Sequence, residues 1–84
     1  MSATAWEFQN RLTAILNGAR KNGKPFVDVT SGNLFKQVEG PEVANLKLPL
    51  CCDVMRKMMR SGDIVLKEPP RGQGAMLTIR YRLS

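Results

Sequence analysis

Residues 63–83 read DIVLKEPPRGQGAMLTIRYRL, which is two extended runs around a turn rich in proline and glycine. The turn covers residues 69–75, and the runs 63–68 and 76–83 predict the two strands of a hairpin. Successive side chains of a strand point to opposite faces, so the second run has a core face and an outer face. The core face is predicted to hold Leu77, Ile79, Tyr81 and Leu83, and the outer face Met76, Thr78, Arg80 and Arg82.

The residues before the hairpin predict a helix that begins near Pro49 and ends at about Arg60, before Gly62. A helix turns by roughly 100° per residue, which divides its side chains into two arcs. The apolar arc holds Cys51, Val54, Met55, Met58 and Met59, with Cys52 nearer its edge. The opposite arc holds Asp53, Arg56, Lys57 and Arg60. We therefore expect a helix with a buried, sulfur-rich face and a compact basic face.

Residues 2–22 predict another helix, because apolar side chains recur there at spacings of three and four. Thr4 and Glu7 match a capping box, in which the hydroxyl and the carboxylate satisfy N–H groups at the helix start. Gly23, followed by Pro25, predicts the helix end.

Residues 26–29 then have the β-branched and aromatic content of a short strand. Thr30 or Ser31 is expected to cap a further helix, which ends by the Gly and Pro at residues 40 and 41. Residues 40–47 are expected to form a loop.

Composition bounds the class of protein. We interpret the 84 residues as a single domain, 1–84, and the 13 Lys and Arg against 7 Asp and Glu, a net charge of +6, favour an anionic partner. The chain has no histidine, and the adjacent Cys51 and Cys52 cannot supply a four-ligand metal site alone. We expect no enzyme activity, metal or cofactor. The chain has neither a secretory signal pattern nor a long apolar run, which predicts a cytoplasmic protein without a membrane partner.

The predicted element order is helix, short strand, helix, helix, strand, glycine-rich turn and strand. This α+β order, over residues 8–83, resembles the winged helix-turn-helix family. In that family the third helix enters the DNA major groove, the first strand pairs with the C-terminal hairpin, and the hairpin turn, called the wing, lies along the phosphate backbone. The resemblance implies a transcriptional regulator that binds double-stranded DNA. The chain departs from the tightest helix-turn-helix units in the longer connection at residues 40–48.

Three shorter runs look like a group of short bacterial proteins of unassigned function, a likeness that names no activity. The runs are SGNL at residues 31–34, LPLCCDVM at 48–55, and PPRGQGA at 69–75 followed by LTIRY at 77–81.

Basic residues in or near the third helix and the hairpin are the candidates for DNA contact: Lys47, Arg56, Lys57, Arg60, Lys67, Arg71, Arg80 and Arg82. Arginine can bind the O6 and N7 edge of guanine bidentately, and lysine can reach phosphates. Gly72 and Gly74 allow the backbone to approach phosphate closely. The alternative is a solvated helix face with an ion pair between Asp53 and Lys57, which are one turn apart.

Other functions stay open. In a protein-interaction module, Trp6, Phe8 and the methionines would hold a protein and the charge would serve solubility. A homodimer through the first helix would double the basic surface and suit a two-fold operator. An enzyme is the weakest interpretation, because no base is identifiable near Ser31 or the cysteines. RNA binding is disfavoured, since stacking platforms need several exposed aromatic residues.

Overall fold

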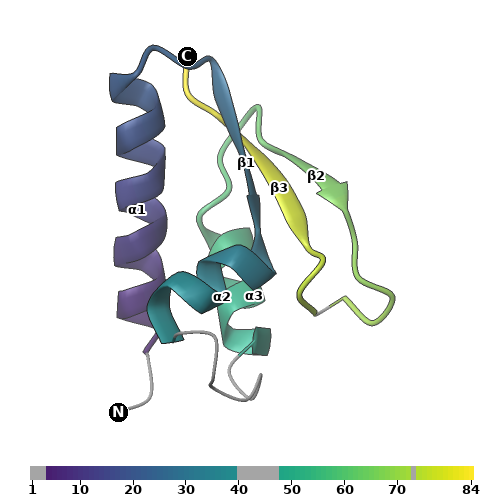
Figure 1. Ribbon diagram of the computed structural model, residues 1–84. Coiled ribbons are helices and arrows are strands. Elements are labelled where there is room, and N and C mark those ends of the chain that lie inside the picture. The colour runs from purple at the N-terminus through teal and green to yellow at the C-terminus, as the bar shows by residue number, and fades with distance from the viewer. Residues whose placement is uncertain (1–3, 40–47, 73) are drawn as a thin grey trace.

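The computed structural model describes residues 4–39, 48–72 and 74–84. These residues form three helices and three strands in the predicted α+β order (Figure 1). The elements are α1 (Ala5–Lys21), β1 (Phe26–Thr30), α2 (Ser31–Glu39), α3 (Leu48–Lys57), β2 (Ile64–Lys67) and β3 (Thr78–Arg82). The strands make one antiparallel sheet in the order β1-β3-β2, and the helices gather on one side of it.

Both ends of α1 follow the local signals in the sequence. The Glu7 carboxylate accepts a hydrogen bond from the backbone N–H of Thr4 at 3.3 Å. At the other end, Gly23 has a φ of 75° and its N–H donates to the carbonyl of Arg20 at 3.0 Å. Glycine adopts this left-handed conformation without a Cβ clash, which allows the chain to leave the helix. The predicted start and stop of this helix are confirmed to within three residues.

Thr30, and not Ser31, caps α2. The Thr30 hydroxyl accepts a hydrogen bond from the N–H of Asn33 at 3.2 Å, which satisfies one of the unpaired donors of the first turn. Ser31 is fully buried and its N–H donates to the carbonyl of Leu77 at 2.8 Å. The predicted end of this helix at residues 40 and 41, and the loop 40–47, lie outside the described residues.

The third helix ends at Lys57, three residues earlier than predicted. The Tyr81 hydroxyl donates to the carbonyl of Met55 at 2.8 Å, and the N–H of Met59 bonds instead to the carbonyl of Arg56 at 3.2 Å. The hydroxyl of the buried Tyr81 therefore satisfies the Met55 carbonyl. In a longer helix this carbonyl would accept a hydrogen bond from a backbone N–H of the same helix.

Arg60 belongs to the turn that follows the helix. Its N–H donates to one carboxylate oxygen of Asp63 at 2.8 Å, and its carbonyl accepts from the N–H of Asp63 at 3.0 Å. The other oxygen of Asp63 accepts from the N–H of Arg82 at 2.7 Å. Asp63 thus fixes the turn against the end of β3, and the expectation that Arg60 lies on the recognition helix is not met.

The sheet has the two faces that the alternation predicts. Leu77, Ile79 and Tyr81 are buried, and Leu83 is half-buried. The two hairpin strands are shorter than predicted, whereas β1 is one residue longer than predicted and ends at Thr30. Strand β2 loses its register with β3 between Val65 and Lys67. The core extends from the sheet to the helices, where Phe8 and Phe35 stack with ring centroids 6.1 Å apart.

Candidate nucleic-acid interface

Half of the ten residues of α3 are buried. Leu48, Cys51, Cys52, Val54 and Met55 are buried, so Cys52 lies in the core and not near the edge of the apolar arc as expected. The side chains that α3 presents to solvent are Pro49, Asp53 and Lys57, and Leu50 and Arg56 are partly exposed. The predicted division into two arcs is correct within the helix, and the exposed arc is narrow.

Arg56 connects this exposed side to the hairpin. Its guanidinium forms an ion pair with the carboxylate of Glu68, the residue that follows β2. The alternative interpretation of this face included an ion pair between Asp53 and Lys57. That pair does not occur in the structure, whose ion pairs among described residues are those of Arg56 and Arg80. The ion pair places the base of the hairpin turn beside the exposed side of α3.

Polar contacts from two buried side chains hold the wing against the helices, where the wing is the hairpin turn together with the last residue of β2 (described residues 67–72 and 74–77). Cys52 Sγ lies 3.3 Å from the carbonyl oxygen and 3.5 Å from the nitrogen of Gly74, as donor to one and acceptor from the other. The Ser31 hydroxyl also donates to the Gly74 carbonyl. The three runs 31–34, 48–55 and 69–75 therefore meet at one place. Sequence reasoning missed this role of Ser31 and Cys52, because their partners are more than 20 positions away.

Gly32 completes this junction. Its N–H donates to the carbonyl of Ala75 at 3.0 Å, and a Cβ atom at this position would lie 3.0 Å from the same oxygen. A larger residue at 32 would push the wing away from α2, so the close approach explains why glycine stands here.

Arg80 is bound within the sheet. Its Nε and Nη2 donate to the two oxygens of Asp28 at 2.8 and 3.1 Å, and its guanidinium carbon lies 4.1 Å from the ring centroid of Phe26. The hydrogen bond from Arg80 holds the pKa of Asp28 below its ordinary value. Because Asp28 and Arg80 are register partners, this pair joins β1 to β3 across the outer face.

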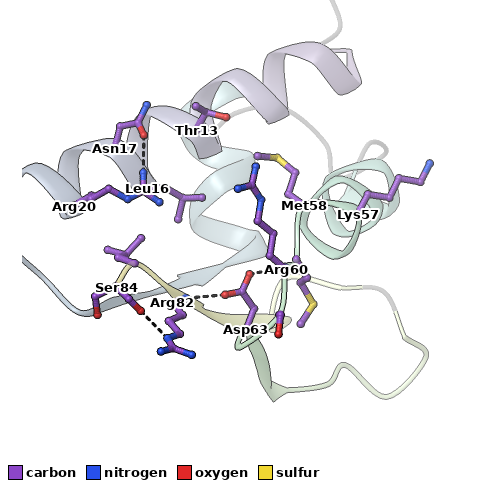
Figure 2. A pocket seen from close by; sticks show the side chains of 13 residues that line it. Thr13, Leu16, Asn17, Arg20, Lys57, Met58, Arg60, Asp63, Arg82 and Ser84 are labelled. Atoms are coloured by element: carbon purple, nitrogen blue, oxygen red, sulfur yellow. Dashed lines mark hydrogen bonds between the residues drawn. The ribbon is translucent and has the colours of Figure 1, made fainter.

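The remaining predicted residues fall into separate groups. Lys47 lies outside the described residues. Lys57, Arg60 and Arg82 line one pocket, together with Arg20 of α1 (Figure 2). Lys67 lines a different groove with Lys36 of α2, and Arg71 is exposed in the turn of the wing. Sequence reasoning missed Arg20 and Lys36, since no local pattern relates them to the hairpin.

The cysteines are buried groups. Burial raises the pKa of the Cys51 thiol to about 12, with a smaller contribution from the neighbouring Cys52, so the Cys51 thiol stays protonated at neutral pH. Among the described residues no group of three or more cysteine or acidic side chains could hold a metal ion. Within the same ranges, no helix has the length and apolar character needed to cross a membrane.

The fold belongs to the α+β class. Three helices and a small three-stranded antiparallel sheet, with β1 paired to the C-terminal strand, are compatible with a winged-helix-like α+β fold. No protein-family model matches the chain, and no match was found among curated proteins or solved structures.

Proposed function

We propose that this chain is a small DNA-binding protein that acts as a transcriptional regulator. In this proposal the exposed side of α3 enters the major groove of double-stranded DNA and the wing lies along the phosphate backbone. Lys57 of α3 and the wing residues Lys67 and Arg71 are the principal contacts, and Arg56 lies between them.

The observation that supports this proposal is the ion pair between Arg56 and Glu68. It brings the basic end of α3 to the base of the wing, so that two elements which a duplex would contact together are adjacent. In α3 and the wing, four basic residues face two acids, Asp53 and Glu68. A surface with this excess attracts phosphates, and its residues on two elements suit a groove and its backbone.

Arg80 contributes less in this proposal than the sequence suggested. Its guanidinium already binds both oxygens of Asp28, and reaching phosphate would require breaking that pair. Arg60 and Arg82 lie around the pocket beside α1, so we treat them as secondary contacts.

Fluorescence anisotropy with labelled duplex DNA tests the proposal. If about four phosphates are contacted, the affinity should fall roughly a hundredfold between 50 and 200 mM salt. Lys57→Gln and Lys67→Gln should each weaken binding and reduce the slope of log affinity against log salt by about 1. No measurable binding at low salt would reject DNA binding.

Lys24→Gln is the matched control. Lys24 is exposed in the turn between α1 and β1, at the end of the molecule away from the wing, and its substitution removes the same charge (Figure 1). It should leave the salt slope unchanged. Equal losses from Lys24→Gln and Lys57→Gln would indicate attraction by total charge and would contradict a specific surface.

In the alternative function, a protein-interaction module, the outer face of the sheet would contact the partner protein. Phe26 and Ile64 are 41% and 49% exposed and flank Arg80, whose charge is paired. Phe8, in contrast, is fully buried, so the expectation that it would hold a partner protein is wrong. A specific protein recovered after nuclease treatment, and lost on Phe26→Ser or Ile64→Ser, together with DNA binding insensitive to Lys57→Gln, would favour this function.

A further inference from the structure

A second candidate site lies between α1 and the C-terminal part of the sheet, separate from the wing. It is an open pocket of about 620 Å³. Its walls come from the second half of α1, from the turn after α3 and from the residues around the end of β3. Its volume lies within the roughly 300–1,000 Å³ that is typical of pockets for small molecules.

Two arginines from distant parts of the chain face this pocket. Arg20 comes from the last turn of α1, where its Nη1 donates to the side-chain oxygen of Asn17 at 2.9 Å. Arg60 comes from the turn after α3, and Figure 2 shows its side chain extending toward α1 while that of Lys57 points away from the other lining residues. No carboxylate of the described residues forms an ion pair with either arginine.

The acid in the pocket wall has its oxygens occupied. Asp63 accepts hydrogen bonds from the backbone N–H groups of Arg60 and Arg82, one on each oxygen. The Arg82 guanidinium turns toward Ser84 and donates to its backbone oxygen at 2.6 Å. Arg20 and Arg60 therefore keep guanidinium donors for a bound anion, and a guanidinium can bind two oxygens of a phosphate at once.

The rest of the wall is partly apolar. Leu16, Met58, Met59 and Leu83 are half-buried and line the same pocket. Methionine side chains adapt their shape and pack favourably against aromatic rings. A ligand that fits this pocket combines an anionic group with a flat apolar part.

We propose that this pocket binds a phosphorylated small molecule of mononucleotide size. Arg20 and Arg60 hold the phosphate, and the apolar part packs on Leu16 and the two methionines. The proposal does not depend on DNA binding, because Arg20 is not among the proposed DNA contacts and Arg60 is only a secondary one.

Isothermal titration with adenosine 5′-monophosphate, adenosine and inorganic phosphate tests this site. The nucleotide should bind, and both adenosine and inorganic phosphate should bind at least about tenfold more weakly, since each lacks one of the two kinds of contact. Absence of nucleotide binding up to ~5 mM, above the roughly millimolar range of weak specific ligands, would overturn the proposal. Equal binding of inorganic phosphate and the nucleotide would also overturn it, because the apolar wall would then contribute nothing.

Substitutions locate the binding. Arg20→Gln and Arg60→Gln should each weaken nucleotide affinity about tenfold, the effect of losing a charge-assisted contact. The matched control is Arg11→Gln, which removes the same charge from an exposed position of α1 that does not line this pocket. Equal effects of Arg11→Gln and Arg20→Gln would contradict the site. Arg20→Gln should leave affinity for duplex DNA unchanged, which separates this test from that of the proposed function.

Discussion

The hydroxyl of Tyr81 donates to the backbone carbonyl of Met55 at 2.8 Å, and this bond joins the central strand β3 to the last turn of α3. Both residues are buried, and the carbonyl has no partner from its own helix at the position where α3 ends. A side chain from the last strand thus determines how α3 terminates. It also sets where Arg56 and Lys57 are presented.

Replacing this tyrosine should weaken the fold without changing its shape. Tyr81→Phe keeps the ring and leaves the Met55 carbonyl unpaired, which should lower the free energy of unfolding by about 1–3 kcal/mol. Urea denaturation followed by circular dichroism measures the change. Trp6→Phe, at a side chain that is 66% exposed, is the control and should change stability by less than about 0.5 kcal/mol. Equal stability of Tyr81→Phe and the parent protein would contradict the role of the bond.

The buried contacts of Ser31 lead to a prediction about the wing. Ser31→Ala removes the hydroxyl that donates to Gly74, which should lower the free energy of unfolding by about 1 kcal/mol. The wing should then open more often, and trypsin should cleave faster after Arg71, which is exposed in the turn. A timed digest analysed by mass spectrometry measures this rate. Ser61→Ala, at an exposed serine, should leave it unchanged, and equal cleavage of all three proteins would refute the docking of the wing by Ser31.

The strands and helix starts could be predicted because their signals are local. Apolar and polar residues alternate over positions 77–82, which indicates the two faces of β3. The helix starts at Thr4 and Thr30 depend on hydrogen bonds between residues three positions apart. Such patterns arise from the side-chain periodicity of a single helix or strand, so they can be recognised without knowing how the elements pack together.

The site could be predicted only in part, because its contacts connect distant positions. The spacing of Asp53 and Lys57 suggested an ion pair within α3, whereas Arg56 pairs with Glu68 on the hairpin. Likewise, Arg20 and Arg60 line one pocket although 40 positions separate them. Pairing across elements depends on how they pack, which no local spacing in the sequence encodes.

High pH should destabilise the protein through its buried thiol and phenol. Burial raises the pKa of Cys51 from 9.0 to about 12, and it also raises that of Tyr81 above its ordinary 10.0. Between pH 9 and 12 the unfolded chain releases protons that the folded chain keeps, so stability falls as pH rises, by at most about 1.4 kcal/mol per pH unit for each group. Below about pH 8, where both groups are protonated in the folded and the unfolded chain, this contribution is constant.

Urea denaturation at pH 8, 9 and 10 measures this dependence. Cys51→Ala should reduce the loss of stability between pH 9 and 10, although the variant starts from a lower stability because it leaves a small cavity. The parent thiols should also resist a thiol reagent at pH 8 until denaturant is added. Rapid labelling of the folded protein, or the same pH dependence in Cys51→Ala, would contradict the burial argument.

Most substitutions in a binding surface weaken binding, but the ion pair between Arg56 and Glu68 predicts one that strengthens it. Glu68→Gln removes a negative charge beside the proposed phosphate path and releases the Arg56 guanidinium. It should therefore strengthen binding to duplex DNA by about two- to fivefold and make the salt dependence steeper by up to about 1 in slope. The fold should hardly change, since the two side chains are 31% and 57% exposed and such pairs contribute about 0–1 kcal/mol.

Glu7→Gln provides the matched control for this prediction. Glutamine also serves at this position of a capping box, so α1 keeps its start while the protein loses one negative charge from a helix outside α3 and the wing. Anisotropy titrations at 50, 100 and 200 mM salt should show a larger gain for Glu68→Gln than for Glu7→Gln. Equal gains would mean that only total charge matters, and weaker binding by Glu68→Gln would mean that the ion pair itself holds α3 and the wing in the arrangement that DNA requires.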